Sequence, residues 1–587
     1  MLPHKQIERK LQSAVQAVLP DADLAPVLVR PCLDPKFGDY QSNALMGLAK
    51  ARKMNPRQLA ADVLAKLDVG ELCEKVEIAG AGFLNFRLQP AALAQTLAAA
   101  ARGEHLFFET APTPKTVVID FSSPNVAKPM HVGHIRSTIL GDSLARALRR
   151  LGHRVITDNH IGDWGTQFGM LLLGWKHHLN AAALKVDPIG EMERLYKMVS
   201  ATGEKMESVR DTARQELVKL QGGDAENLKI WQEMIALSQH QFDAIYGRLG
   251  VKFNHTLGES FYNPRLKPLV EDLLAKGIGR ESEGAVAIFF DTVPQLKERP
   301  AIVRKSDGGF NYTTTDLATL AYRLETWHPD EIIYVTDGRQ QLHFQQVFTA
   351  FRSWQSALGN PHSAFPMLAH VWFGSILGED GKPFKTRSGE TVKLADLLDE
   401  AEERALKIVI AKQHERPEDE RVPQSLWPEI ARVVGIGSVK YADLLPNRQS
   451  DYVFSWEKML AFNGNTAPYL QYAHARIKSI FRKAEGTFNL QPSTFNLQLT
   501  APEELALGRH LLNFGLTLEA VAEEYRPNFL CNYLYELAGR FTAFYENCPV
   551  LKSDGATRTS RLILCDLTAR VLKQGLEILG IETVEQM

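Results

Sequence analysis

The sequence is poor in several features that would assign a protein to a special class. Its 587 residues contain only five cysteines, and no two of them form a CxxC pair. This scarcity argues against a zinc knuckle and fits a reducing compartment, so we expect no protein-bound zinc and no metal ligands of the chain's own. No apolar run approaches the roughly 20 residues that cross a bilayer, so we expect no membrane span.

The sequence also lacks an excess of charge of one sign. It has 67 Lys and Arg residues against 69 Asp and Glu residues, a formal net charge of -2. Any nucleic-acid surface must therefore be local. The N-terminus has helical spacing and carries Glu8 among its bases, so it resembles neither a secretory signal nor a clear transit peptide, and we expect a cytoplasmic protein.

Composition shifts divide the chain, which is long enough for about three or four domains. Residues 1–113 alternate helical and strand-like segments and predict an α+β module. Residues 114–454 carry buried strands followed by helices, with a charge-rich helical insertion around 180–250. In residues 455–587 strand signals almost vanish, which predicts a separate helical domain. The leading helix of that domain is basic, which is typical of a solvated face and compatible with an RNA contact.

The most informative segment is Thr116 to Leu151. A β-branched run passes through a Ser, Pro and Asn loop into an amphipathic helix, and a second strand-like run begins at Arg154. This order predicts a βαβ unit whose helix N-terminus lies at the carboxyl end of parallel strands. His131 and His134 fall in the first helical turn, where unpaired backbone N–H groups and the helix dipole favour a phosphate.

The two histidines alone have other interpretations. A pair at i and i+3 could be half of a metal site, or two buried and satisfied imidazoles. The preceding strand and proline-bearing loop favour phosphate chemistry, and Gly133 between the histidines would let an adenine ring approach the backbone. The dinucleotide and P-loop fingerprints are absent, which excludes a dehydrogenase and a Walker-type ATPase.

Other expectations concern the later segments. We expect a short polar strand before a helix over Leu317–Glu325, and a buried strand over Glu331–Thr336 that ends in a polar loop. A single helix is expected over Glu503–Glu524. Lys36 to Asn43 joins aromatic and small polar residues, and composition does not decide between a capped turn and a base-stacking surface.

Five motifs resemble those of class I arginyl-tRNA synthetases, and together they cover essentially the whole chain. They are SPNVAKPMHVGHIRST (123–138), NHIGDWGTQFG (159–169), NYTTTDLA (311–318), RQQLHF (339–344) and NTAPYLQYAHARI (465–477). The resemblance implies a multidomain α/β protein: a Rossmann-like class I catalytic domain with helical insertions, an N-terminal α+β module that contacts the tRNA D-loop and elbow, and a C-terminal all-α anticodon-binding domain.

The resemblance also implies an activity. Members of this family are arginine–tRNA ligases that use ATP with Mg²⁺ to form arginyl-adenylate from L-arginine, then esterify the terminal adenosine of tRNA(Arg), first at its 2′-hydroxyl. We expect a monomer. Two rivals are a small-molecule nucleotidylyltransferase of the same superfamily, against which the long helical C-terminal region argues, and a tRNA-binding paralogue without catalysis.

Site residues follow from the resemblance, residue by residue. The HIGH signature region comprises Pro124, Asn125, Val126, Ala127, Lys128, Pro129, Met130, His131, Val132, Gly133 and His134. Within it, Lys128, His131, Gly133 and His134 are expected to bind ATP, and Lys128, His131, His134 and Lys385 to be catalytic. Arginine is expected to bind Asp120, Asn125, Tyr312, Asp316 and Gln340.

Two of these assignments have simpler alternatives. A carboxylate such as Asp316 suits the planar fork of a guanidinium, but Asp316 could also be the N-cap of its helix. The family departs from the usual class I KMSKS loop, and here Ser388 stands where a second catalytic lysine would be. Lys128, three residues before His131, could supply the missing charge, or it could be an exposed loop lysine.

Overall fold

The structure, a computed structural model, describes residues 1–587 except 33, 360–364, 386–390, 485–496 and 554. The chain forms two compact units, each assembled from separate stretches of sequence. Unit 1 comprises 1–111, 417–426 and 461–587, and unit 2 comprises 112–416 and 427–460. Among the described residues, no helix is long and apolar enough to cross a membrane.

Unit 2 is built on a five-stranded parallel sheet with strand order β12-β11-β5-β6-β7. The predicted βαβ unit is confirmed: β5 (Thr116–Phe121) leads into α5 (Val132–Arg150), and β6 (Arg154–Asn159) pairs parallel to β5. Val117, Val118 and Ile119 of β5 are fully buried, which explains its apolar run. The carboxyl ends of β5 and β6 therefore open beside the N-terminus of α5.

The other strands extend this sheet on both sides. The bounds are β7 His255–Thr256, β11 Glu331–Val335 and β12 Met367–His370. In the parallel register, Asp120 of β5 lies opposite Asp158 of β6 on one side and Tyr334 of β11 on the other. Three polar side chains thus meet at the carboxyl edge of the sheet, where ligands bind in open α/β folds.

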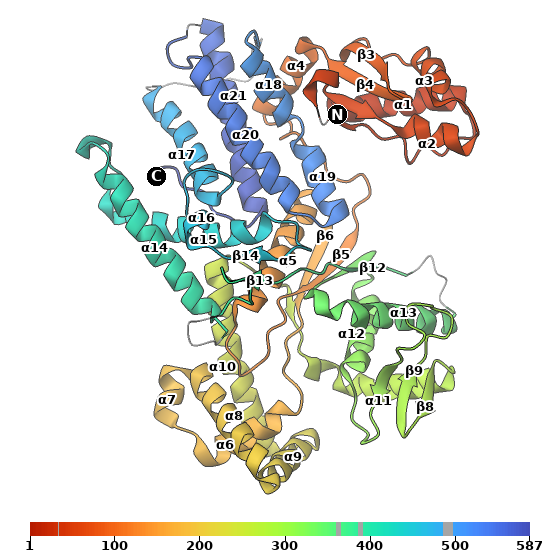
Figure 1. Cartoon of the computed structure of the whole chain (residues 1–587), viewed down its shortest axis with the longest axis vertical. Helices are drawn as coiled ribbons and strands as arrows, with labels where there is room; N and C mark the ends of the chain where they lie inside the picture. Colours follow the sequence, from red (N-terminus) through yellow and green to blue (C-terminus); the bar gives the residue numbers. More distant parts are fainter. Residues whose placement is uncertain (33, 360–364, 386–390, 485–496, 554) are drawn as a thin grey trace. The chain divides into compact units, whose positions relative to one another are not determined.

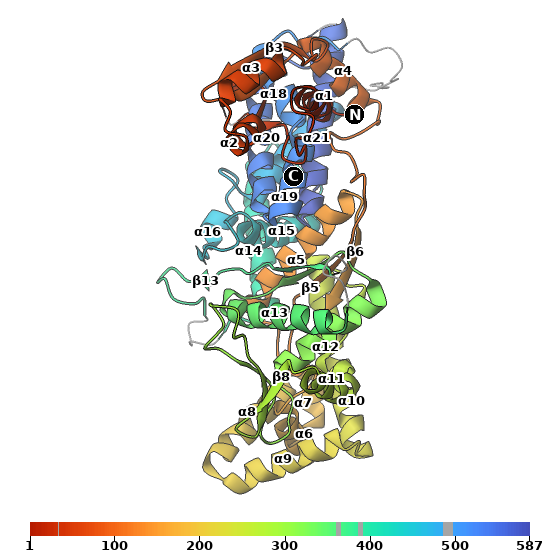
Figure 2. The same cartoon turned by 90° about the vertical axis from the view of Figure 1, so that its right-hand side faces the viewer.

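The helical insertion consists of five helices: four pack together at one end of unit 2 (Figure 2), and the longer α10 packs against α6, α8 and α9 and leads back to the sheet. They are α6 (Gln167–His178), α7 (Ala181–Val186), α8 (Pro188–Lys205), α9 (Glu207–Gln221) and α10 (Ala225–Leu249). Side chains of Asn180, Asp187 and Asp224 cap three of them, as expected for short polar residues at helix starts.

A second, antiparallel sheet follows the insertion, with strand order β10-β9-β8. Its strands are β8 (Gly279–Ser282), β9 (Ala285–Ile288) and β10 (Ala301–Arg304), and it shares a core with helices α11 (Asn263–Ala275), α12 (Tyr312–Trp327) and α13 (Gln341–Ala357). The expectation of a polar strand before residue 317 is wrong. Asn311 caps α12 by accepting the N–H of Tyr312, so the helix begins five residues earlier than predicted.

The end of unit 2 is helical. Helices α14 (Leu394–His414) and α15 (Trp427–Leu444) lie side by side in Figure 1, and the short helix α16 (Trp456–Met459) follows. A two-stranded parallel pairing joins β13 (Ile376–Leu377) to β14 (Tyr452–Val453). From α5, Arg136 reaches this pairing: its guanidinium is buried, pairs with Asp443 at 2.9 Å and donates to the carbonyl of Gly374 at 2.8 Å.

Unit 1 combines both ends of the chain. The N-terminal stretch has a four-stranded antiparallel sheet, order β1-β2-β4-β3, with strands β1 (Arg30–Pro31), β2 (Tyr40–Ser42), β3 (Cys73–Ala79) and β4 (Phe83–Leu88). Its helices are α1 (Pro3–Val18), α2 (Ala44–Ala51), α3 (Pro56–Leu64) and α4 (Pro90–Ala101). The predicted α+β character of this module is confirmed.

The C-terminal stretch of unit 1 consists of helices α17 (Ala467–Lys483), α18 (Pro502–Leu511), α19 (Phe514–Glu524), α20 (Asn528–Asn547) and α21 (Gly555–Ile578). The single helix expected over Glu503–Glu524 is wrong, because two helices meet near Asn513. Gly515 lies directly against the backbone of Phe107 and donates its N–H to the Phe107 carbonyl at 3.0 Å. The chain turns from α18 into α19 beside this close backbone approach.

Candidate active site

The two histidines of the HIGH region stand at the start of α5, but in a different way from the one predicted. His131 is the N-cap, and its Nδ1 accepts the N–H of Gly133 at 3.0 Å. The Nδ1 of His134 accepts the N–H of His131 at 3.1 Å, and the N–H of Val132 is taken by the carbonyl of Val392. The backbone N–H groups that the sequence offered to a phosphate are therefore already bonded.

This arrangement fixes the tautomer of both rings. A nitrogen that accepts a hydrogen bond carries no proton, so the proton of each neutral imidazole is on Nε2. Burial, together with the neighbouring His131, lowers the pKa of His134 to about 3. Burial, followed by the Lys128 ammonium, also lowers the pKa of His131. The two rings, 4.0 Å apart, thus present two neutral Nε2–H donors at neutral pH.

The neighbours of these rings support the same chemistry. A Cβ at position 133 would come within 3 Å of the His131 ring, so glycine is needed here for the cap itself. Lys128 lies close enough to His131 to affect its pKa, and its Nζ is 5.3 Å from the ring centroid of Tyr196 in α8. Lys128 is half-buried rather than fully exposed. A fixed cation therefore stands beside two neutral donors.

The loop that leads into α5 is held in an unusual backbone conformation. Ser122, Ser123 and Ala127 have φ angles of 75°, 49° and 61°, which cost non-glycine residues about 1–2 kcal/mol each. Their N–H groups donate to the side chains of Ser137, Asn159 and Ser238, respectively, at 2.8 to 3.1 Å. This backbone is thus fixed from three other segments of unit 2.

Asn125 lies between these strained residues. Its side chain is exposed, and its backbone forms a parallel bridge with Gly162, where a Cβ would collide with the Asn125 amide. The NHIGDWG segment therefore pairs with the HIGH loop and supports it. This pairing explains why the polar loop after β6 needs a glycine, and it leaves the Asn125 side chain free to meet a ligand.

Asp120 does not stand alone at the end of β5. Arg323 of α12 donates through Nη2 to Oδ2 of Asp120 at 2.6 Å and to Oδ2 of Asp158 at 2.7 Å. The hydroxyl of Ser123 donates to the other oxygen of Asp120 at 3.2 Å. Sequence reasoning assigned neither Arg323 nor Asp158 to the site: Asp158 stands near the end of a buried strand, but nothing in the sequence indicates that Arg323, inside α12, pairs with it.

Asp316 and Tyr312 are brought together one turn apart on α12. Asp316 is not the N-cap of the helix, because Asn311 holds that position. Instead Oδ2 of Asp316 accepts a bond from Nε2 of His343 at 2.5 Å, and the Tyr312 ring packs edge-on against His343 with centroids 4.7 Å apart. Gln340 is exposed at the turn before α13, where the structure places it near the start of the helix that carries His343.

Electrostatic effects connect these acids with one another. Burial raises the pKa of Tyr334, and the charges of Asp120 and Asp316 raise it further against the opposing Arg323. Burial also raises the pKa of Glu259 to about 7, with Asp316 and Asp163 adding to the effect and His160 opposing it. Glu259, which sequence reasoning missed, therefore belongs to an acidic group around Asp316. Such a group favours a cationic ligand.

Lys385 is exposed in the segment that follows β13. Its backbone pairs with Thr391, and residues 391–394 return directly to the HIGH region, where Lys393 pairs with His131. The N–H of Leu394 donates to the carbonyl of Met130 at 2.9 Å. The base of the Lys385 loop is thus attached to the start of α5. Ser388 lies outside the described residues.

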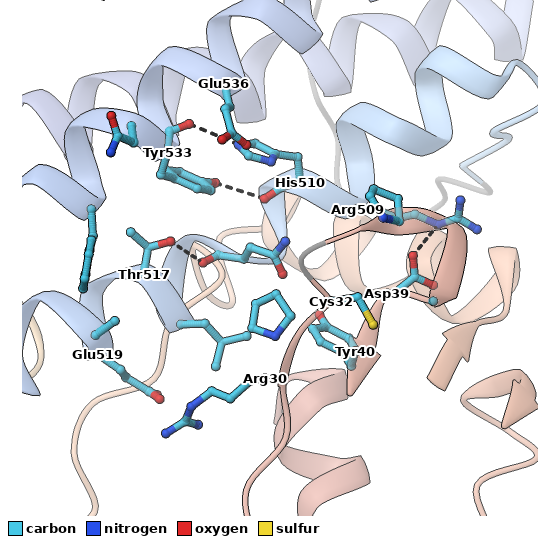
Figure 3. A pocket seen from close by; sticks show the side chains of 18 of the residues that line it. Arg30, Cys32, Asp39, Tyr40, Arg509, His510, Thr517, Glu519, Tyr533 and Glu536 are labelled. Atoms are coloured by element: carbon cyan, nitrogen blue, oxygen red, sulfur yellow. Dashed lines mark hydrogen bonds and ion pairs between the residues drawn. The ribbon is translucent and has the colours of Figure 1, made fainter. Parts of the chain in front are cut away.

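A separate cavity of about 500 Å³ lies in unit 1, where the N-terminal module meets α18, α19 and α20 (Figure 3). Arg509 and Asp39, which both line it, pair across that boundary at 3.1 Å, and the lining residue Glu519 pairs with Lys5 of α1 at 3.1 Å. These two ion pairs join the module to the helices. Among the helices, His510 of α18 donates to the carbonyl of Tyr533 of α20 at 3.1 Å, and the two rings stack.

In the described part of the chain, no group of three or more His, Cys, Asp or Glu side chains could hold a metal ion. The residues singled out from the sequence instead form two groups. Lys128, His131, Gly133 and His134 surround the start of α5, and Tyr312 and Asp316 lie in an acidic group that extends through Tyr334 to Asp120. The first group suits phosphate oxygens, and the second suits a basic small molecule.

Three family models match the chain in succession. The N terminal domain of arginyl tRNA synthetase matches residues 5–88, the catalytic domain of class I (R) tRNA synthetases matches 96–456, and the DALR anticodon binding domain matches 470–587. The basic helix and the helical C-terminal stretch fall largely within the last of these matches.

Curated relatives match over their full length. An arginine–tRNA ligase of Chromobacterium violaceum is 46% identical over 100% of both chains, and one of Proteus mirabilis is 47% identical over 99% of both. Among solved structures, the arginyl-tRNA synthetase of Plasmodium falciparum superposes with a TM-score of 0.82 at 30% identity, covering 100% of this chain and 99% of that one.

Proposed function

Because the chain belongs to the class I arginyl-tRNA synthetases, we propose that its two groups of site residues divide the reaction between them. The chain is an arginine–tRNA ligase: it activates L-arginine with ATP to arginyl-adenylate and transfers arginine to the 3′-terminal adenosine of tRNA(Arg), releasing AMP and pyrophosphate. The group at the start of α5 acts on ATP, and the acidic group around Asp316 binds arginine.

The observation that carries the ATP assignment is the pair of capped imidazoles. Both Nδ1 atoms are occupied by backbone N–H groups, so each Nε2–H is held ready to donate. Neutral donors that need no reorganisation stabilise the charge that develops on phosphate oxygens as the arginine carboxylate attacks the α-phosphorus. Lys128 adds a cation against the leaving pyrophosphate, and Lys385 approaches from the loop attached to Met130.

Arginine recognition is assigned to the acidic group. A guanidinium has five planar donors, and a carboxylate meets two of them in a fork that a lysine ammonium cannot fill. Asp316 supplies this carboxylate, Tyr312 and Gln340 supply neutral acceptors, and Glu259 supplies a second acid. Asp120 and Asn125, at the end of β5 and in the HIGH loop, face the α-ammonium and the carboxylate, respectively.

The remaining assignments concern partners. We assign tRNA elbow binding to residues 1–113, catalysis to 114–454 and anticodon binding to 455–587. In α17 the half-buried Arg476 lies 4.7 Å from the Tyr545 ring and Lys478 pairs with Glu585, whereas Arg482 and Lys483 are exposed. Mg²⁺ enters with ATP, coordinated by phosphate oxygens, and the enzyme works as a cytoplasmic monomer.

Asp316→Asn tests the arginine site. The change keeps the shape of the side chain and its bond to His343 but removes the charge that meets the guanidinium. Truncating one partner of a buried charge pair costs about 2 to 5 kcal/mol, so the arginine KM should rise and turnover fall steeply while the ATP KM stays near its original value. Pyrophosphate exchange with tRNA(Arg) present measures these constants.

The matched control is Asp307→Asn, at an exposed turn residue whose Oδ1 accepts the N–H of Gly309. It should leave both Michaelis constants unchanged. An unchanged arginine KM in Asp316→Asn would remove Asp316 from the site.

A further inference from the structure

Arg323 is a fully buried cation of unit 2, and it is shared by two acids. The exposed fractions are 0% for Arg323, 0% for Asp158 and 3% for Asp120. Both hydrogen bonds leave from the same nitrogen, Nη2, and reach one oxygen of each carboxylate at 2.6 and 2.7 Å. When both acids are ionised, two negative charges are matched by one positive charge.

The unpaired atoms of this cluster lower the free energy of unfolding. Nε and Nη1 of Arg323 and Oδ1 of Asp158 are buried and have no hydrogen-bond partner within the described residues. Unpaired polar atoms in a low dielectric are destabilising, and a half-satisfied network of this kind is worse for stability than an apolar core. A role in the site explains why such a cluster is tolerated at the carboxyl edge of the sheet, where it borders the acidic group.

The cluster also joins the elements that carry the arginine site. Asp120 and Asp158 lie opposite each other in the register of β5 and β6, whereas Arg323 comes from α12. Asp316 lies seven residues before Arg323 on the same helix, so both side chains project from one face, two turns apart. The two hydrogen bonds of Arg323 therefore set the distance between the sheet edge with Asp120 and the helix with Asp316.

We propose that Arg323 is a positioning residue for arginine binding, and that Asp158 is the second acid that holds Arg323 in place. Arg323 holds Asp120 and the α12 face with Asp316 in register. This inference rests on the arginine site proposed above, and it assigns to Arg323 no contact with the substrate.

The test changes the hydrogen-bond geometry of the cluster while keeping its formal net charge. Arg323→Lys keeps the positive charge, but the lysine nitrogen ends one bond short of Nη2 and cannot reach both carboxylates. The double variant Arg323→Met/Asp158→Asn removes one formal positive and one formal negative charge, and with them the link between α12 and the strands. It also serves if Arg323→Lys does not fold, since Asp120 is then the one acid of the cluster that remains.

In both variants the arginine KM should rise roughly 10- to 100-fold, the range expected when a binding group is displaced by about 1 Å, while the ATP KM stays within about twofold. Pyrophosphate exchange with tRNA(Arg) gives both constants, and thermal melting confirms folding. Glu325→Gln is the control: it breaks the exposed pair with Arg265 on the same helix and should change neither constant.

An arginine KM at the original value in a folded Arg323→Lys or double variant overturns the proposal. So does a parallel rise of the arginine and ATP constants, which indicates general loosening. Asp316→Asn separates the proposed arginine site from the proposed positioning role of Arg323. If it leaves arginine binding intact, the site itself is misplaced, whereas a raised KM there together with unaffected Arg323 variants defeats only the positioning role.

Discussion

Replacing His131 in two ways would separate the two nitrogens of its ring. Asparagine places an amide oxygen where Nδ1 accepts the N–H of Gly133, so His131→Asn keeps the N-cap of α5 and removes the Nε2–H. Glutamine places its amide nitrogen near the position of Nε2, so His131→Gln keeps a donor for ATP and loses the cap. One substitution thus removes the chemistry, and the other removes the local structure.

The magnitudes follow from these contacts. Asparagine is among the best N-cap residues, whereas loss of a cap costs about 1 kcal/mol, so only His131→Gln should lower the free energy of unfolding. Loss of one preorganised donor to developing charge lowers kcat by about 10²- to 10³-fold, so His131→Asn should be the slower enzyme. The family resemblance leads us to include tRNA(Arg) in the pyrophosphate exchange assay, with urea unfolding for stability.

Two outcomes would refute this reasoning. An undiminished exchange rate in His131→Asn would show that Nε2 does not act on ATP. A rate loss in His131→Gln as large as in His131→Asn, with no loss of stability in either, would show that the ring nitrogens do not have separate roles.

Three further predictions address other parts of the catalytic unit and the helices. Lys128→Ala should lower the kcat of adenylation by roughly 10²- to 10³-fold with little change in the arginine KM. The control, Lys185→Ala at an exposed lysine of the insertion, should have no effect, and equal rates in the two variants would reject the role of Lys128. Arg136→Met leaves Asp443 buried without a cation, so urea unfolding should show a loss of about 3–5 kcal/mol, and Arg136→Met/Asp443→Leu should recover most of it. A single variant as stable as the parent contradicts this. Burial lowers the pKa of His510 to about 4, below the unfolded value of about 6.5, so the unfolded chain binds a proton first as the pH falls. The folded protein therefore loses stability between about pH 6.5 and pH 4, and His510→Gln should lose less over that range. Identical pH profiles of the two proteins would exclude His510 as a cause.

Local patterns in the sequence were enough to predict the βαβ unit. β5 is a run of β-branched residues buried on both faces, and α5 repeats apolar residues with helical spacing, so each element's pattern agrees with its environment. The start of α12 was missed because Thr313, Thr314 and Thr315 have the β-branched side chains of a strand. The cap at Asn311 outweighs that preference.

The candidate site could be predicted residue by residue but not as a network. Motifs gave His131, His134 and Asp316, yet nothing local shows that a histidine ring accepts the N–H of its own helix start. Arg323 contacts acids 203 and 165 residues away, and His343 contacts an acid 27 residues away. Such partners are chosen by the topology of the sheet, and a single sequence contains no signal for them.

The composition of unit 1 has a consequence for how the protein is made. Its N-terminal module packs against helices that begin after residue 460, so roughly 350 residues must be translated before the module can meet them. At about 5–20 residues per second the ribosome needs roughly 20–70 s for that stretch. During this interval Lys5 lacks Glu519 and Asp39 lacks Arg509, and the surface that later packs around Gly515 is open to water. The N-terminal module therefore exposes this surface until the C-terminal helices have been synthesised.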